Sequence, residues 1–325
     1  MHPAFSVIFL TTLIGAGQGL FLALYTGQLY SAFKVLPVQD SAHYYVLGSL
    51  IVLVLLVAGL FSSFFHLGRP ERGWRAVARW RTSWLSREVI VLPAFTAVVA
   101  AWGLILYMSW NPLLFTFGGA YEINLSLAVG AVATLLCFTL FLCTGMIYAC
   151  IKQLQEWATP LTVVNYTLLG ISSGFILATA YATWQGSGLS EFFGGWAIFS
   201  TVVAFATRSA SLVRNARIRP KSTLETAIGI RHSRIEQKAQ GSMAGSFNTR
   251  EYFHGATKRK FRFVKWIFLV LAFPVPLILL SIGLGTQSIT TLIAAFVVQY
   301  IGLLAERWFF FAQANHPQNL YYQTV

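Results

Sequence analysis

The sequence predicts an all-α fold, that of a polytopic integral membrane protein in which a single membrane domain, residues 1–325, forms a bundle of eight transmembrane helices. Of the 325 residues, 56% are hydrophobic and only 10% are charged, whereas a soluble domain carries about 25% charged residues. The mean hydropathy is +0.65. Eight stretches also reach the length of about 20 mostly apolar residues that crosses the hydrocarbon core of a bilayer. We expect these spans at about 4–30, 43–67, 87–110, 123–151, 160–184, 192–212, 263–284 and 287–312.

The first span begins directly after Met1-His2-Pro3, without a basic segment or a clear cleavage site. It is therefore expected to serve as its own targeting signal. Gly15 and Gly19 within it have the GxxxG spacing, which favours close packing between two helices.

The second, third and fourth spans are joined by short segments. The second ends at His66, and the third is expected to have Ser86 as its N-cap and Glu88 in its first turn. Asn111-Pro112 separates the third span from the fourth. The fourth contains all three cysteines without a CxxC motif, so they are interpreted as packing residues and not as metal ligands.

Proline, glycine and one long basic loop separate the last four spans. Thr159-Pro160 precedes the fifth span and Gly186-Ser187-Gly188 precedes the sixth, while Gly283 and Gly285 mark a short final hairpin. The loop 213–262 between the sixth and seventh spans is the one sizeable soluble segment. It is expected to hold one helix with a weak apolar face (Leu224, Ala227, Ile228 and Ile235) and an irregular stretch over Ser242–Gly255. Two interpretations stay open for it: a solvated tether attracted to anionic lipid, or a docking surface for a partner subunit.

The charge distribution predicts the orientation in the membrane. With eight spans, all of the 23 lysines and arginines except Lys34 fall on the side that carries both termini. The opposite side has Lys34 together with Asp40, Glu122 and Glu191. The positive-inside rule then places both termini and the basic loops in the cytoplasm, with the spans in the bacterial inner membrane. The net charge of +13 is thus interpreted as a topology signal and not as a sign of nucleic-acid binding.

The segment between the second and third spans contains six arginines and no lysine. Arginine is preferred where forked hydrogen bonds to carboxylates, phosphates or a protein surface matter. We expect most of the six to contact a partner subunit and lipid headgroups, although they would also serve as a plain topology signal. They are Arg69, Arg72, Arg75, Arg79, Arg81 and Arg87.

His66 and Glu88 lie at the two ends of this segment, so the sequence predicts that they are neighbours at the edge of the hydrocarbon. A histidine and a carboxylate there can bind a quinone carbonyl and relay its proton. The structural alternatives are a histidine bonded to a backbone carbonyl and a glutamate that is stabilised by the helix dipole.

Haem binding and a transport function are less well supported by the sequence than quinone binding. His43 and His66 are 23 residues apart on one predicted helix, a separation of about 35 Å, so they cannot ligate one iron. Transporters usually bury charged residues near the middle of the membrane. The span interiors are expected to offer only neutral polar groups, with Glu306 and Arg307 forming a local ion pair near one end of the last span. A small-anion carrier nevertheless stays open as an alternative.

The arginine segment resembles a known family, the membrane-anchor subunits of dimethyl sulfoxide reductase-type molybdenum enzymes. The matching stretches are His66-Leu67-Gly68-Arg69-Pro70 and Ser83-Trp84-Leu85-Ser86-Arg87-Glu88. The resemblance implies an eight-helix anchor without haem that holds an iron–sulfur subunit and a molybdopterin catalytic subunit at the membrane. It also implies electron exchange between the nearest cluster and ubiquinone or menaquinone, with His66 matching the family's quinol-binding histidine and Glu88 a nearby carboxylate.

Four other stretches are similar to the anchors of cytoplasmic sulfite dehydrogenases within that family. They are Pro3–Val7, Thr144–Ala149, Gly245–Glu251 and Glu306–Phe310. The resemblance favours an anchor that delivers electrons from sulfite oxidation to quinone. The alternatives are the anchor of a sulfoxide-type reductase that oxidises quinol, which has no long basic sixth loop, or a structural tether with quinone bound elsewhere.

The residues expected to have a functional role fall into two groups, one for binding quinone and one for docking a partner subunit. The quinone-binding group is His66, Glu88, Arg69, Arg81 and Ser86. The partner-docking group is Arg72, Arg75, Arg79, Arg87 and Arg250.

Overall fold

The computed structural model describes residues 1–325 except 40, 119–120, 237, 239–252 and 318–325. In the part that it describes, eight helical stretches are long and apolar enough to cross a membrane, which confirms the predicted all-α bundle. The main helices are α1 (Phe5–Ala32), α2 (Val46–Ser63), α3 (Trp84–Tyr107), α4 (Leu125–Ala149), α5 (Pro160–Trp184), α6 (Ser190–Ala216), α9 (Lys258–Leu271), α10 (Pro274–Thr286) and α11 (Ile289–Gln313).

Shorter elements connect these helices. A π-helical turn over Ser41–Tyr45 precedes α2, and the 3-10 helices Phe64–His66 and Pro70–Arg79 follow it. An antiparallel hairpin joins α3 to α4 through β1 (Leu113–Phe117) and β2 (Tyr121–Asn124). The long basic loop contains the short helix α7 (Leu224–Ile228), which Thr223 caps. Ile235 lies beyond this helix, and most of Ser242–Gly255 and Arg250 lie outside the described residues.

Two helix boundaries differ from the sequence-based expectation. The third span begins three residues earlier, because the side chain of Ser83 caps α3 by accepting a hydrogen bond from the Ser86 backbone N–H at 3.3 Å. The prediction that Ser86 is the N-cap is therefore wrong, and its side chain is buried inside the first turn. The seventh span is two helices, since α9 ends at Leu271 and α10 begins at Pro274, a residue that cannot donate a backbone hydrogen bond.

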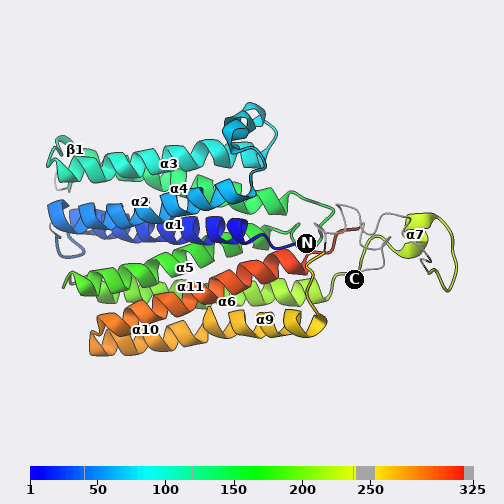
Figure 1. The fold of residues 1–325 in the computed structure, drawn as a ribbon. Helices are drawn as coiled ribbons and strands as arrows, with labels where there is room; N and C mark the ends of the chain where they lie inside the picture. Colours follow the sequence, from blue (N-terminus) through cyan, green and yellow to red (C-terminus); the bar gives the residue numbers. More distant parts are fainter. Residues whose placement is uncertain (40, 119–120, 237, 239–252, 318–325) are drawn as a thin grey trace.

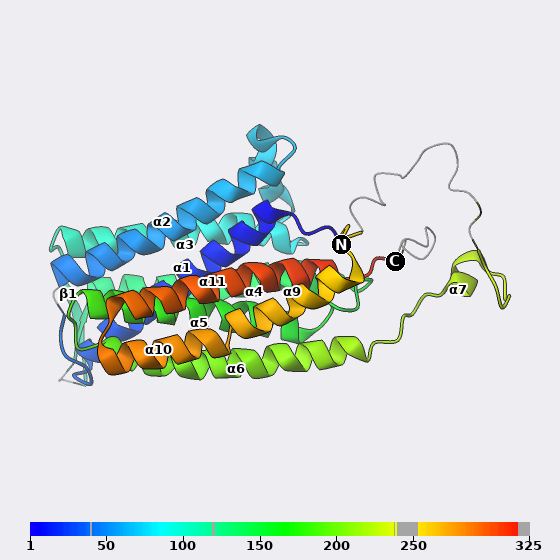
Figure 2. The same cartoon turned by 60° about the horizontal axis from the view of Figure 1, so that its bottom comes forward.

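Helix α1 lies at the centre of the bundle. In Figure 1 it lies between α2 and α5 and packs against both, while α4 packs against α3 and α5 (Figures 1 and 2). The closest crossing is with α5, where a Cβ atom added to Gly19 would overlap the Gly170 carbonyl oxygen and one added to Gly174 would overlap the Gly19 carbonyl carbon. This contact confirms the close packing predicted from the GxxxG spacing.

Replacing Gly174 by alanine is expected to lower the stability of the bundle. The added methyl meets backbone atoms of α1, which cannot rotate away, so the two helices must separate, at a cost of about 1–3 kcal/mol or more. Thermal unfolding of the purified protein in detergent measures the effect. Gly195→Ala is the matched control, because nothing lies within 4 Å of a Cβ atom at Gly195. Equal melting temperatures for the two variants would contradict the close crossing.

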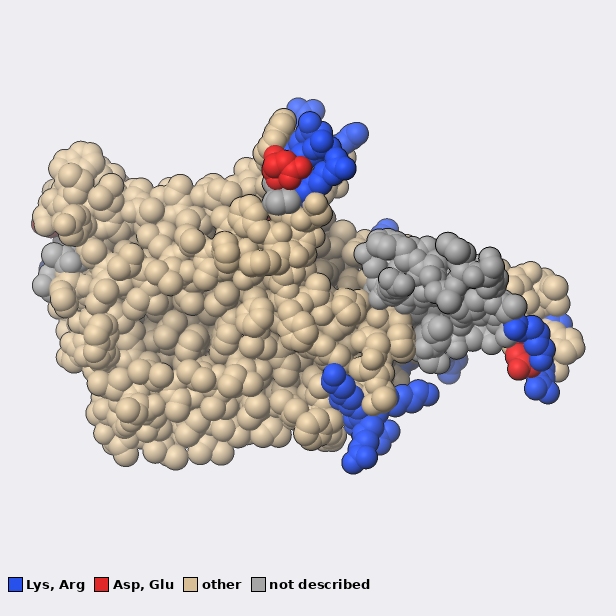
Figure 3. Space-filling view, viewed as in Figure 1, with Lys and Arg blue, Asp and Glu red and all other residues tan. Residues whose placement is uncertain are grey.

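The charged residues are concentrated at one end of the bundle. The N-terminus and the end of α11 lie at this end, together with the arginine segment and the start of α9, whereas the β1–β2 hairpin lies at the other (Figure 1). Figure 3 shows the lysines and arginines of this face of the molecule gathered in the same region. We call it the basic end. Lys34 follows α1 at the opposite end, as the distribution in the sequence predicts.

Candidate functional site

His66 is the last residue of the second span and lies at the basic end. Its short 3-10 helix continues α2, and Leu67 then turns the chain into an extended conformation. The imidazole is exposed, and in the described part of the chain no hydrogen bond or ion pair is formed with it. An exposed, unpartnered imidazole at a bilayer edge is free to bind a group supplied from outside the chain.

The segment after His66 forms a platform of arginine and tryptophan side chains, residues 69–81, which we call the arginine platform. Arg69, Arg72, Arg75, Arg79 and Arg81 are exposed. Arg75 and Arg81 lie against the rings of Trp74 and Trp80, with 5.6 and 5.4 Å between guanidinium carbon and ring centroid. The one ion pair that these residues form within the described part of the chain is weak, since Arg72 lies 3.8 Å from Glu71 and both side chains are at least half exposed. Most of the charge of the platform therefore faces outward.

Arg87 differs from the other five arginines because its side chain binds within the chain. It donates to the carbonyl oxygens of Trp80 and Arg81 at 3.0 and 2.9 Å and lies 4.2 Å from the Trp84 ring centroid. These contacts fasten the end of the arginine platform to the start of α3. We infer a role for Arg87 in holding this segment in place.

Glu88 is partly buried, and its carboxylate faces α4. It accepts a hydrogen bond from the hydroxyl of Thr144 on that helix. Among the described residues, no hydrogen bond or ion pair joins Glu88 to His66. The helix ends that carry them are connected by the arginine platform, but the carboxylate is held by the third and fourth spans and not between the second and third.

A cluster of buried charges lies near the basic end of the bundle, and the sequence-based reasoning missed it. Arg208 Nε of α6 lies 2.7 Å from Glu306 Oε1 of α11, and Arg307 Nη1 lies 3.3 Å from Glu306 Oε2. The exposed fractions of these side chains are 2%, 1% and 5%. The prediction of a local Glu306–Arg307 pair is confirmed, but the expectation of only neutral polar groups inside the spans is wrong.

The sequence does contain a signal for the buried position of Arg208. Thr201, Ala204, Arg208 and Ser211 are spaced by three or four residues, which places them on one face of a helix, and all four are buried. This face of small and polar residues packs inward and brings Arg208 with it. The charge distribution had counted Arg208, inside the expected span 192–212, only as one of the basic residues on the side of the termini.

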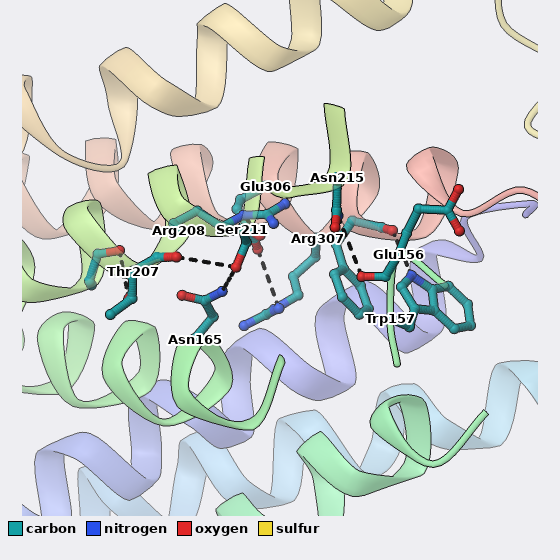
Figure 4. A network of polar contacts seen from close by, with 11 residues as sticks. Glu156, Trp157, Asn165, Thr207, Arg208, Ser211, Asn215, Glu306 and Arg307 are labelled. Carbon is teal, nitrogen blue, oxygen red and sulfur yellow. Dashed lines mark hydrogen bonds and ion pairs between the residues drawn. The ribbon is translucent and has the colours of Figure 1, made fainter. Parts of the chain in front are cut away.

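Aromatic and amide groups surround this ion cluster. The guanidinium of Arg307 lies 3.5 Å from the centroid of the Tyr166 ring, and that ring stacks on Tyr148 with centroids 5.5 Å apart. Asn165 Nδ2 donates to Ser211 Oγ at 2.7 Å. Figure 4 shows Asn165 of α5, Arg208 and Ser211 of α6, and Glu306 and Arg307 of α11 lying close together. The residues enclose a cavity of about 10 Å³, enough for one water molecule.

An eight-span bundle with an outward-facing arginine platform at one end is the architecture of a polytopic membrane anchor, a protein that holds others at the bilayer. Residues 1–312 match the family model described as DMSO reductase anchor subunit (DmsC), and the chain belongs to this family. It is also 55% identical to a sulfite dehydrogenase subunit of Allochromatium vinosum over 325 residues, which cover the whole of both chains. The resemblance carried by the two motifs around the arginine segment is thereby confirmed.

Proposed function

We propose that this chain is the quinone-reactive anchor of a complex that oxidises sulfite to sulfate. The substrate class is supported by the full-length, 55% identical relative named as a sulfite dehydrogenase subunit. The quinone role depends chiefly on one observation, that the unpartnered imidazole of His66 lies where the arginine platform meets the spans. A quinone in the membrane and a protein on the platform would both reach that position.

The proposed quinone site has His66 and Glu88 at its polar end. The imidazole binds one quinone carbonyl, and Glu88, which is partly exposed and stabilised by Thr144, exchanges a proton with the reacting oxygen. Arg69, three residues after His66, and Arg81, at the end of the arginine platform, are both exposed and are proposed to orient the head group or the adjoining subunit. The side chain of Ser86 is buried in the first turn of α3, two residues before Glu88, and its proposed part is to support that end of the quinone site.

The proposed partners are an iron–sulfur subunit that docks on the arginine platform and a molybdopterin subunit that oxidises sulfite. Arg72, Arg75 and Arg79 face outward and are available for carboxylates on the partner; Arg250 lies outside the described residues. The concentration of positive charge at the basic end supports a cytoplasmic location for the partners and for both termini, in the bacterial inner membrane. Electrons would pass from the nearest iron–sulfur cluster to ubiquinone or menaquinone.

The test is His66→Ala in the purified complex. Sulfite oxidation is followed with a soluble one-electron acceptor and, separately, with a short-chain quinone. Loss of a group that hydrogen-bonds and relays a proton should lower the quinone rate about 100-fold, while the rate with the soluble acceptor stays that of the wild type.

His43→Ala is the matched control, because His43 is an exposed histidine at the opposite end of the same span. It should leave both rates unchanged. If His66→Ala keeps the full quinone rate, or loses both rates with the subunits still assembled, His66 is not the point at which electrons leave the complex for quinone.

A further inference from the structure

The first turns of α9 carry a high concentration of positive charge. The basic residues here are Lys258, Arg259, Lys260, Arg262 and Lys265. Cations at the N-terminus of a helix oppose its dipole, which favours negative charge there. Within the part of the chain that the structure describes, none of these five side chains forms an ion pair. The cations and the helix dipole therefore both favour an anion that is supplied from outside the described residues.

The two faces of α9 have different surroundings. The inner face packs against the end of α11, where the ring of Phe261 stacks on that of Phe309 with centroids 4.5 Å apart, and Phe268 is fully buried. The outer face has the same helical spacing of three or four residues. It contains the exposed residues Arg259, Arg262, Phe263, Trp266 and Val270. Because α9 belongs to a membrane-spanning stretch, the exposed apolar residues of this face contact lipid.

A groove of about 550 Å³ lies on this part of α9. It is lined by Thr257, Arg259, Lys260, Arg262, Phe263 and Trp266. The ammonium of Lys260 also lies 6.0 Å from the centroid of the Trp308 ring, which connects this side of the groove to α11. Figure 3 shows the lysines and arginines at the start of α9 projecting from the bundle, apart from those of the arginine platform. The groove is therefore cationic where it begins and aromatic where it continues into the span.

The outer face of α9 changes along the helix in the order in which a phospholipid changes from head to tail. Arg259 and Arg262 come first, and a guanidinium donates forked hydrogen bonds to phosphate oxygens. Phe263 and Trp266 follow, with exposed fractions of 66% and 60%, and aromatic rings favour the headgroup level of a membrane. Val270 comes eleven residues after Arg259, about 16 Å along the helix, which is about half the thickness of the hydrocarbon core. A free phosphate ion would use only the first part of this face.

We propose that the outer face of α9 binds one anionic phospholipid, with the phosphate held by Arg259 and Arg262 and the acyl chain against Phe263, Trp266 and Val270. The negative charge of the lipid offsets the cations that the helix dipole opposes. Occupancy therefore stabilises the first turns of α9 and their packing on α11. The site lies on a different side of the bundle from the arginine platform (Figure 1), and it does not depend on the proposed quinone chemistry.

The test measures the binding of a short-chain phosphatidylglycerol to the purified complex in a neutral detergent by native mass spectrometry. Arg259→Gln together with Arg262→Gln removes two charges and keeps polar side chains. Each basic residue near an anionic lipid surface contributes about fivefold to affinity, so the double variant should bind the lipid about 30-fold more weakly. In lipid nanodiscs, replacing phosphatidylcholine by phosphatidylglycerol should raise the melting temperature of the wild type more than that of the double variant.

Arg217→Gln together with Arg219→Gln is the matched control. These two arginines are exposed directly after α6 at the same end of the bundle, so the control removes the same charge. It should bind the lipid as the wild type does. Equal weakening by the two double variants would overturn the site, because it would assign the attraction to the overall charge of the basic end. Wild-type binding in the α9 variant would overturn it as well.

Two further measurements complete the test. Excess inorganic phosphate should not displace the lipid, because a free ion does not contact the aromatic part of the face; full displacement would show a site for a free anion and contradict the proposal. In phosphatidylcholine alone, the α9 variant should be at least as stable as the wild type, because the removed cations oppose the helix dipole. A lower melting temperature there would show that the two arginines stabilise the chain without lipid, which would also contradict it.

Discussion

Glu306→Ala is expected to destabilise the protein by about 3–5 kcal/mol, the usual cost of removing one partner from a buried ion pair. The variant leaves Arg208 and Arg307 in an interior where their exposed fractions are 2% and 5%. Two like charges would then be buried close together without the carboxylate that separates them. The loss appears as a large decrease in melting temperature in detergent, or as failure of the protein to accumulate in the membrane.

The control is Glu191→Ala. Glu191 is an exposed carboxylate in the first turn of α6, where its interaction with the helix dipole contributes about 0.3–1 kcal/mol. A Glu306→Ala protein as stable as the Glu191→Ala protein would show that the buried guanidinium groups do not depend on this carboxylate.

Reversing the charge of Arg72, Arg75 and Arg79 together, to glutamate, is expected to release the partner subunits from the membrane. These side chains are exposed and form no strong ion pair with any residue that the structure describes. A partner with complementary carboxylates would then meet like charges, which costs several kcal/mol at an interface. The measurement is the distribution of the iron–sulfur subunit between membrane and soluble fractions, with the melting temperature of the anchor as a check on folding.

A second variant with three charges reversed distinguishes docking on the arginine platform from an effect of the total charge of the basic end. Lys258, Arg259 and Arg262 are also exposed at the basic end, at the start of α9, away from the arginine platform. Changing these three to glutamate alters the net charge by the same amount and should leave the partner subunits bound. Equal release by the two triple variants would assign docking to the overall field of the basic end and not to the platform.

The position of His66 could be predicted from sequence, but the orientation of Glu88 could not. His66 ends a long apolar run, so its place at the edge of the bilayer follows from length alone. Glu88 lies in the first turns of the next span, and a carboxylate there can face either neighbouring helix. The hydroxyl of Thr144 on α4 decides the direction, because it supplies a hydrogen-bond donor inside the bundle.

The sequence by itself determined the eight spans, the common side of the basic segments and the family. Hydropathy and charge act over contiguous residues, so they can be summed along the chain without knowing any contact between helices. The tertiary structure alone decided that Arg208 turns inward to meet Glu306 and that Tyr148 and Tyr166 stack beside the ion cluster. These contacts join helices that are distant in the chain, and a polar side chain inside a span is stable only where packing brings it a partner.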